Sequence, residues 1–312
     1  MNKVTIIGCG SVGSTIAYTL TVTGIASSIV MVDVNNERAQ GEAMDIIQGT
    51  PFCGPCAIHA GDYSDAVGSD IVIITAGVAR KPGQSRLDLA QINVNILKSI
   101  ISSVVKYAPD ANYIIVSNPV DVLTYAFCKL SGVPEERVIG SGTILDTARL
   151  RSRLSECCAI NQLNVHAYVF GEHGDSSFVP WTTANIANVP ILQYNEVRSG
   201  EKLPPLAYDD IEDYVRKSGA RIIQGKGATY YAVAISVCHI CKALLDGIDT
   251  AMTVSTMLHG EYGIDDVCLS IVNVVGNKGA HTKVLLPLSP EEEAMLRKSA
   301  DSLKAVINSI TI

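Results

Sequence analysis

Three residues of this chain have the types and the spacing needed to move a proton onto and off an oxygen atom beside a carboxylate. His173 lies in the glycine-flanked segment Gly171–Ser176. A histidine exchanges protons near neutral pH, and a carboxylate beside it would fix its tautomer and stabilise the imidazolium. Asp146 and Arg149 are three residues apart on an expected helix, so they share one face. One could orient the histidine, and the arginine could bind a substrate carboxylate through two hydrogen bonds.

Each of these residues also has an ordinary structural interpretation. A single histidine is more often a satisfied structural residue than a catalytic one. An Asp/Arg pair at this spacing is usually a surface salt bridge of little energetic weight. Taken alone, the three residues leave the function open between a catalytic and a structural role.

A glycine-rich segment near the start of the chain has the spacing of a dinucleotide-binding turn. Gly8–Gly13 reads GxGxxG and lies between an expected strand and an expected helix. In this motif Gly8 permits the tight turn, Gly10 lets the backbone approach a pyrophosphate, and Gly13 lets helix and strand pack closely. The helix N-terminus then offers unpaired N–H groups and a favourable dipole to the anion.

An acidic residue follows the next strand where the motif requires one. Asp33 ends the run Ser28–Asp33, and a carboxylate there can accept hydrogen bonds from ribose hydroxyls while repelling a 2′-phosphate. The segment therefore predicts an NAD site rather than an NADP site. The alternative is a structural glycine turn with an ordinary surface aspartate.

The apolar patterns of the first half show which elements must position these residues. Short β-branched runs alternate with helical patterns, which predicts a doubly wound parallel sheet of the Rossmann type in an α/β fold. The expected strands are Lys3–Gly8, Ser28–Asp33, Asp70–Ala76 and Asn112–Ser117. The expected helices are Ser11–Thr23, Glu37–Gln48, Leu87–Tyr107 and one that begins at Pro119.

The pattern changes after Gly142, which places a boundary near Ser141–Leu145. We expect a Rossmann domain over residues 1–142 and an α+β substrate and catalytic domain over residues 143–312. Its predicted elements are a helix at Ile144–Glu156, a strand at Asn164–Phe170, a largely helical stretch at Tyr208–Asp246 with breaks at Gly225 and Gly227, strands at Ala251–His259 and Val267–Val275, and a helix at Pro290–Ile310.

The composition argues against several other classes of protein. The net charge is −7, and no basic stripe of the kind that binds nucleic acid is present. No apolar run reaches the roughly 18 residues that span a bilayer, and no secretory signal is visible. Nine cysteines include two CxxC pairs, Cys53/Cys56 and Cys238/Cys241, without the matching ligand pairs of a zinc site. We expect a soluble cytoplasmic protein with free thiols and no metal.

Several motifs together give the chain a resemblance to a known family. It resembles the lactate/malate dehydrogenase family from end to end. The segments that carry the resemblance are Gly8–Gly13, Thr75–Gly77, Gly83–Leu89 (GQSRLDL), Ser117–Asp121 (SNPVD), Leu145–Arg149 (LDTAR) and Gly171–Ser176 (GEHGDS).

The resemblance implies a role for each candidate residue in transfer of a hydride between NAD and a 2-hydroxy acid. His173 would be the proton donor and acceptor, Asp146 its partner, and Arg149 the residue that binds the 1-carboxylate. Arg86 would polarise the reacting carbonyl, and Asn118 would hydrogen-bond near the substrate oxygen and the nicotinamide. Along the cofactor the family places Gly8, Gly10, Val12, Gly13, Asp33, Tyr63, Gly77, Val116, Asn118 and Ser141.

Two parts of the sequence point to different substrates. Gln224–Tyr231 and Ser255–Asp266 are similar to bacterial lactate dehydrogenases, and Thr229 matches the threonine beside the methyl side of their substrate. However, Arg80 stands where lactate dehydrogenases typically have glutamine. An arginine at this position is typical of malate dehydrogenases. Gln84 also replaces the usual glutamate of the lactate enzymes, which removes a negative charge near Arg80.

Physical chemistry favours a dicarboxylate beside Arg80. When a substrate loop closes, water leaves and the arginine needs a partner. Oxaloacetate supplies a second carboxylate, whereas pyruvate supplies only a methyl group. Losing one partner of a buried ion pair costs about 3–5 kcal/mol, which corresponds to roughly several hundredfold in specificity. We therefore expect malate and oxaloacetate to be favoured. The alternative is an L-lactate dehydrogenase in which Arg80 extends into solvent.

The resemblance also bears on regulation and assembly. Arg151 and His166 match the pair with which many bacterial lactate dehydrogenases bind fructose 1,6-bisphosphate across a subunit interface. The alternative is that both are ordinary polar residues of an interface. The family implies a homotetramer, with a homodimer as the alternative.

Two other function classes compete with the enzyme. They are a non-catalytic NAD-binding protein and a structural protein recruited from a dehydrogenase. A protein of the first class would be expected to have lost His173, Arg149 or Asp146, and all three are present.

Overall fold

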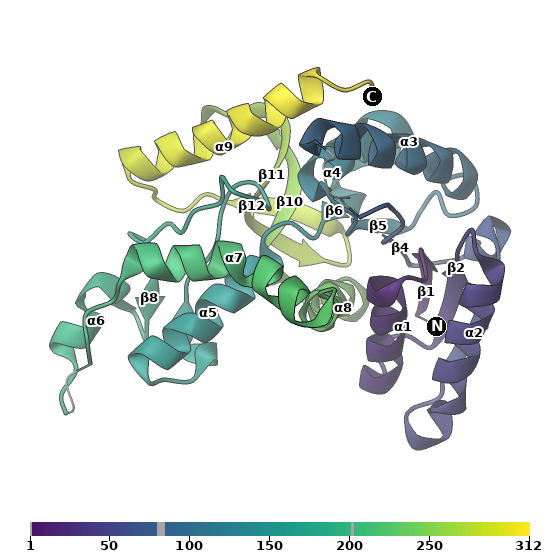
Figure 1. Ribbon diagram of the computed structural model, residues 1–312, viewed down its shortest axis with the longest axis horizontal. Coiled ribbons are helices and arrows are strands. Elements are labelled where there is room, and N and C mark those ends of the chain that lie inside the picture. The colour runs from purple at the N-terminus through teal and green to yellow at the C-terminus, as the bar shows by residue number, and fades with distance from the viewer. Residues whose placement is uncertain (1, 80–84, 201–202) are drawn as a thin grey trace.

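Among the described residues of the first half, six strands lie side by side in one parallel sheet, which Figure 1 shows between the flanking helices. In chain order they are β1 (Lys3–Ile7), β2 (Ser28–Val32), β3 (Ala57–Ala60), β4 (Ile71–Ile74), β5 (Asn112–Ile115) and β6 (Val138–Gly140). Their order in the sheet is β3-β2-β1-β4-β5-β6, so the order reverses between β1 and β4. The computed structural model describes residues 2–79, 85–200 and 203–312.

Helices cover both faces of this parallel sheet. They are α1 (Ser11–Thr23), α2 (Asn36–Gln48), α3 (Arg86–Val104) and α4 (Val120–Ser131). Ile6 and Ile7, neighbours in β1, belong to two different buried clusters because successive side chains of a strand point to opposite faces. Ile7 is clustered with Leu97 of α3 and Phe127 of α4, whereas Ile6 is clustered with Leu20 of α1. The predicted Rossmann architecture is confirmed.

The second half extends the same sheet. Strands β10 (Thr250–His259), β11 (Asp265–Gly276) and β12 (Gly279–Val284) pair antiparallel in that order. β10 also pairs antiparallel with β6 through Ser255 and Gly140, so nine strands form one continuous sheet. A small separate sheet consists of β7 (Val165–His166), β8 (Asn185–Ile186) and β9 (Val189–Pro190).

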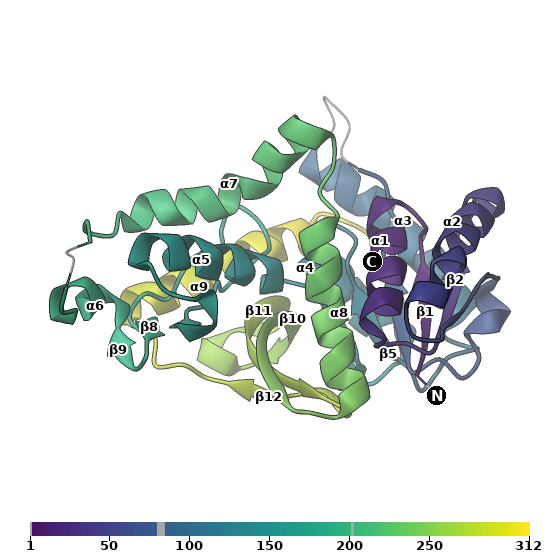
Figure 2. The same ribbon diagram turned by 90° about the horizontal axis from the view of Figure 1, so that it is seen from below.

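Five helices complete the part of the second half that the structure describes. They are α5 (Ile144–Cys158), α6 (Ile191–Val197), α7 (Tyr208–Lys226), α8 (Tyr231–Asp246) and α9 (Pro290–Asn308). Figure 2 shows α7 running above α5, and α8 standing beside α1 of the first half. The helices α5, α7 and α8 therefore surround the region where the two halves meet. No described helix combines the length and the apolar composition that crossing a bilayer requires.

The sequence patterns missed several short elements. β3 and β6 were not expected, because four and three residues are too few to show a period. β12 was not expected either, because its buried and exposed residues do not alternate regularly. The expected strand Asn164–Phe170 is shorter, with Val165–His166 in the small sheet and Phe170 in an isolated bridge. Gly225 does not break its helix, which continues to Lys226 and ends at Gly227 with a φ of +87°.

Candidate active site

The glycine-rich loop between β1 and α1 is shaped for close approach of another group. Gly8 has a φ of +102°, and a Cβ on it would lie 2.6 Å from the backbone nitrogen of Ala76. A Cβ on Gly13 would lie 1.9 Å from the carbonyl oxygen of Gly8, so α1 packs this closely only because Gly13 lacks a side chain. A Cβ on Gly10 would meet nothing within 4 Å. An anion can therefore approach the backbone N–H groups at the start of α1.

Asp33 is held beside this loop by two backbone hydrogen bonds. Its Oδ2 accepts a hydrogen bond from the N–H of Cys9 (2.6 Å), and its Oδ1 accepts one from the N–H of Asn35 (2.8 Å). The carboxylate thus lies between the glycine loop and the end of β2. A cavity of about 460 Å³ opens there, and its lining includes Gly8, Gly10, Asp33, Tyr63, Gly77 and Val78.

The remaining predicted cofactor residues lie toward the candidate catalytic residues. Val12, Val116 and Asn118 line a second cavity of about 370 Å³. Val116, Asn118 and Ser141 line a small adjoining cavity that also includes His173. The predicted cofactor residues thus run from the glycine loop to the histidine. This arrangement fits an extended dinucleotide whose nicotinamide end meets the histidine.

Asp146 brings the two other predicted catalytic residues together. Its Oδ2 lies 2.5 Å from Nδ1 of His173, and its Oδ1 accepts a hydrogen bond from Nη1 of Arg149 (2.8 Å). Asp146 is in the first turn of α5, one turn before Arg149. The histidine loop is anchored to the large sheet by a β-bridge between Gly171 and Ser270 of β11. The ring of His173 stays 28% exposed, so a substrate can reach it.

The charges of Asp146, Arg149 and His173 shift the pKa values of the histidine and the aspartate in opposite directions. The Asp146 carboxylate, and the hydrogen bond to it, raise the pKa of His173 and outweigh the desolvation of its partly exposed side chain. Burial acts to raise the pKa of Asp146, but His173 and Arg149 together outweigh it and lower that pKa. At neutral pH the arrangement therefore favours an imidazolium beside an aspartate. Since Nδ1 faces Asp146, Nε2 is the ring atom left to exchange a proton with a substrate.

The cavity beside His173 combines charged and apolar walls. The walls come from the segment before α4, from α5, the histidine loop and α7, and from α8 with the segment before it. The residues include Asn118, Arg149, His173, Arg216, Ile223, Thr229 and Val233. Arg149 can bind a carboxylate at one end, while Ile223 and Val233 present aliphatic surface. A small acid with a polar end and a short side chain matches such a lining.

Sequence reasoning missed three residues of this region. Arg216 lines the cavity and pairs with Glu212 one turn earlier on α7. Asn93 of α3 accepts a hydrogen bond from the N–H of Val78 (2.9 Å) and donates one to the carbonyl oxygen of Asn118 (2.6 Å). Asp121 accepts a hydrogen bond from the backbone N–H of His173. Asp121 belongs to the SNPVD motif, but the motif alone did not indicate a role for it.

The residues expected to choose the substrate are only partly described. Arg80 and Gln84 lie outside the described residues. The backbone of Arg86 begins α3, after the N-cap Ser85, whose hydroxyl accepts a hydrogen bond from the N–H of Asp88. Thr229 lines the cavity together with His173, as expected.

Arg151 and His166 meet at a different cavity, of about 360 Å³, on the other side of α5. Nε of Arg151 donates a hydrogen bond to the carbonyl oxygen of Ala167 (3.0 Å), and its guanidinium lies 5.0 Å from the ring centroid of Tyr168. His239 of α8 lines the same cavity. One guanidinium and two imidazoles therefore face one opening, and burial together with the Arg151 charge lowers the pKa of His239.

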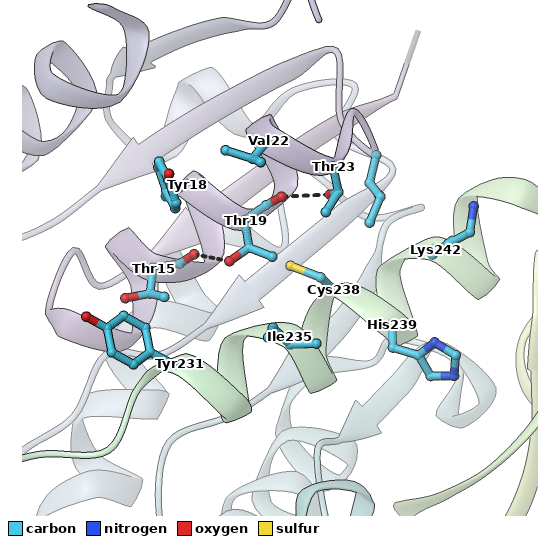
Figure 3. Close-up of a pocket in the computed structure, with 11 residues that line it drawn as sticks. Thr15, Tyr18, Thr19, Val22, Thr23, Tyr231, Ile235, Cys238, His239 and Lys242 are labelled. Atoms are coloured by element: carbon cyan, nitrogen blue, oxygen red, sulfur yellow. Dashed lines mark hydrogen bonds between the residues drawn. The ribbon is translucent and has the colours of Figure 1, made fainter. Parts of the chain in front are cut away.

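An apolar groove runs between α1 and α8, away from the catalytic residues (Figure 3). Its wall on α1 includes Tyr18 and Val22, and its wall on α8 includes Tyr231 and Ile235. Tyr231 and Ile235 are each 63% exposed, and Tyr18 is 57% exposed. We call this surface the α1–α8 groove.

Comparison with protein families covers nearly the whole chain. Residues 2–140 match the family described as lactate/malate dehydrogenase, NAD binding domain. Residues 143–311 match the family described as lactate/malate dehydrogenase, alpha/beta C-terminal domain.

Individual relatives are similar over their full length. The chain is 48% identical to the L-lactate dehydrogenase of Thermoanaerobacter sp. (strain X514), over 100% of both chains. It is 46% identical to the L-lactate dehydrogenase of Acetivibrio thermocellus, over 100% of this chain and 98% of that protein. Among solved structures, a minor L-lactate dehydrogenase from Enterococcus mundtii, in its ligands-bound form, matches with a TM-score of 0.95 and 37% identity. That match covers 100% of this chain and 99% of the other.

Proposed function

Because the chain belongs to the lactate/malate dehydrogenase family, and is thus an NAD-dependent oxidoreductase, we propose that it interconverts L-lactate and pyruvate. The observation that carries the proposal is the position of Asp146 between His173 and Arg149, in a cavity that also contains Asn118. We assign residues 1–142 to cofactor binding and residues 143–312 to substrate binding and catalysis.

Each residue has a distinct task in the proposed reaction. Bound NAD supplies the hydride acceptor, or NADH the hydride donor. Arg149 binds the 1-carboxylate with the guanidinium nitrogens that Asp146 does not engage. His173 takes the hydroxyl proton of lactate at Nε2, and Asp146 stabilises the resulting imidazolium. Arg86 and Asn118 polarise the carbonyl, and in the reverse direction the imidazolium returns the proton to the oxygen.

Two observations support lactate as the substrate. Ile223 and Val233 line the cavity beside Thr229, and their aliphatic surface suits a methyl group better than a charged one. The relatives compared above, similar over their full length, carry the name L-lactate dehydrogenase. Together these observations favour lactate over the malate preference expected from Arg80.

Malate and oxaloacetate remain the second candidate pair because of one residue. Arg80 places a cation in the substrate loop, where a dicarboxylate would give it a partner. The choice between the two pairs therefore depends on whether Arg80 faces the substrate.

The deciding experiment follows NADH oxidation by the purified protein with pyruvate and with oxaloacetate, and compares the two values of kcat/KM. A higher value for pyruvate supports the proposal. A higher value for oxaloacetate replaces it with the second candidate. Activity on neither substrate would reject both and leave a non-catalytic NAD-binding or structural protein.

A single substitution tests the role of Arg80 in the same assay. If Arg80 faces the substrate, Arg80→Gln raises the ratio of the pyruvate kcat/KM to the oxaloacetate kcat/KM by roughly a hundredfold. The substitution removes a buried cation that oxaloacetate would pair with and that pyruvate would leave unpaired. If Arg80 extends into solvent, the ratio changes little. Lys81→Gln, which removes a neighbouring positive charge, is the matched control.

We further propose that the protein is a cytoplasmic homotetramer. Its activity would be regulated by fructose 1,6-bisphosphate. The cavity shared by Arg151, His166 and His239 supports an anion site, since phosphate groups prefer such donors. Adding the sugar bisphosphate to the assay should lower the pyruvate concentration at half saturation, and an unchanged saturation curve would reject the regulation.

A further inference from the structure

A second carboxylate contacts the catalytic histidine at its backbone, whereas Asp146 contacts its ring. Asp121 is only 2% exposed, and its Oδ2 accepts a hydrogen bond from the backbone N–H of His173 (2.8 Å). It lies in the first turn of α4, whereas Asp146 lies in the first turn of α5. Two helices that start 24 residues apart thus each direct one carboxylate to the same histidine.

The surroundings of Asp121 are unusual for a purely structural carboxylate. Its Oδ1 has no hydrogen-bond partner of ordinary geometry among the described residues, although the Ser255 hydroxyl lies close enough to lower the pKa. Burial nevertheless raises the pKa of Asp121 to about 6. The group is therefore still mostly ionised at neutral pH, at a cost in desolvation that a neutral asparagine would avoid.

We propose that Asp121 is a positioning residue of the reaction, whose buried charge acts on His173 through its backbone N–H and through space. The inference deepens the proposed dehydrogenase function and rests on it. Asp121 is not among the residues that line the substrate cavity, and its hydrogen bond to His173 is made to the backbone N–H. It acts through His173.

Charges of both signs surround the ring of His173. The charged and titratable groups that face His173 come from α5, α4, α7 and its own loop, and they are Asp146, Arg149, Asp121, Arg216, Glu172 and Asp175. Arg149 opposes the imidazolium, and its charge is partly offset by Asp146. A second buried carboxylate therefore tips the balance toward the protonated ring, which is the form that donates a proton to a 2-keto acid.

The groups packed around Asp121 do little to disfavour its ionised form. They are the Ser255 hydroxyl of β10, the Cys268 thiol of β11, Glu172 and His173. Of these, only Glu172 works against the ionised form by charge. The position of Asp121 at the start of α4 also favours a negative charge there.

A neutral hydrogen bond next to Asp121 allows anchoring of the histidine loop to be distinguished from the effect of the Asp121 charge. The N–H of Glu172, one residue before the histidine, donates a hydrogen bond to the hydroxyl of Ser299 in α9 (2.8 Å). Besides the β-bridge at Gly171, the loop therefore has two adjacent side-chain anchors, one neutral and one charged. If anchoring were the only task, a neutral acceptor would serve at both positions.

The experiment compares Asp121→Asn with Ser299→Ala. Asparagine keeps an oxygen for the N–H of His173 but removes the charge, whereas Ser299→Ala removes an anchor without changing any charge. For each protein, kcat/KM for the 2-keto acid is measured against pH at saturating NADH. In Asp121→Asn the pH at which kcat/KM falls to half its plateau is expected to move down by about one unit. In Ser299→Ala it stays where it is in the unchanged protein.

Either of two results would overturn the proposal: an unchanged midpoint in Asp121→Asn, or the same downward shift in both variants. If Asp121→Asn is insoluble, Asp121→Ser, which is smaller and also neutral, gives the same test. Failure of the proposed function is distinguishable, because then the unchanged protein oxidises NADH with neither pyruvate nor oxaloacetate.

Discussion

At the scale of single residues, the site depends on one carboxylate shared between two cations. Asp146 contacts His173 with one oxygen and Arg149 with the other. The histidine pKa is raised from 6.5 to about 9, so the ring is protonated in the free site at neutral pH. The same shift makes His173 stabilise the fold below pH 6.5, and this contribution is lost as the pH rises toward about 9.

The direction of this shift gives a pH dependence. Reduction of the 2-keto acid needs the imidazolium and should stay near its plateau through neutral pH, then fall as the pH passes the raised pKa. Replacing Asp146 by asparagine removes the charge that causes most of the rise. We expect kcat/KM to drop by about 10²–10⁴ and the midpoint of the pH profile to move toward lower pH.

A control for this prediction lies on the same helix. Glu156 is 59% exposed and pairs with Arg153, so Glu156→Gln removes an equal charge from α5 without reaching the cavity. Its pH profile should match that of the unchanged protein. An Asp146→Asn variant with an unmoved midpoint would contradict the assignment of Asp146 as the partner of His173.

The sequence could predict part of this site. The spacing of Asp146 and Arg149 shows that they share a helix face, and the contact between them agrees with it. Nothing local shows that His173, 27 residues after Asp146, folds back onto it, since that depends on how the histidine loop is anchored to β11. Only the resemblance of whole motifs could suggest the pairing. Asp121 gave no local signal at all.

At the scale of elements, the contact between α1 and the loop that follows β1 depends on a missing side chain. A Cβ on Gly13 would come within 1.9 Å of the Gly8 carbonyl oxygen, so Gly13→Ala must move the helix away from the loop. We expect a loss of about 1–3 kcal/mol in the free energy of unfolding. NADH should also bind more weakly, because the N–H groups of α1 are displaced. Thermal unfolding and fluorescence titration with NADH measure the two effects.

Gly41 offers a matched comparison within a helix. It lies in α2, and a Cβ there would meet nothing within 4 Å. Gly41→Ala should therefore stabilise the protein by about 0.5–1 kcal/mol, since alanine loses less conformational entropy in a helix. Equal effects of the two substitutions would show that Gly13 is not a packing contact.

The elements that sequence patterns predict well are the long ones. α1 begins and ends where its pattern placed it, at Ser11 and Thr23, because thirteen residues show the helical period clearly. β6 was missed because its three residues carry no period, and its position depends on pairing with β5 and β10 on either side. Short strands of this kind are determined by their neighbours rather than by their own residues.

At the scale of the whole molecule, the α1–α8 groove supports the proposed assembly. Tyr18, Tyr231 and Ile235 expose more than half of their surface there, and a second copy of the chain would cover them. Ile235 also lines the cavity of Arg151 and His166, so the groove and the proposed anion site adjoin. An interface at this face would place the sugar bisphosphate site beside the partner subunit.

We expect Ile235→Asp to weaken this association. A charge in the middle of a buried apolar contact would be left without a partner, so the variant should sediment with a smaller mass than the unchanged protein at equal concentration. Phe52→Asp, a charge placed at a residue that is 91% exposed and outside the groove, is the control and should leave the mass unchanged. Equal masses for all three proteins would place the interface elsewhere.

The seam between β6 and β10 bears on which pieces of the chain can exist apart. Gly140 faces Ser255 there, and a Cβ on Gly140 would lie 2.9 Å from the Cβ of Ser255 and 2.3 Å from the Thr124 hydroxyl. A fragment that stops at Gly142 would leave β6 as an open, apolar edge, which is a template for aggregation. Chimaeras that exchange one half between relatives must therefore carry both sides of this seam from the same parent.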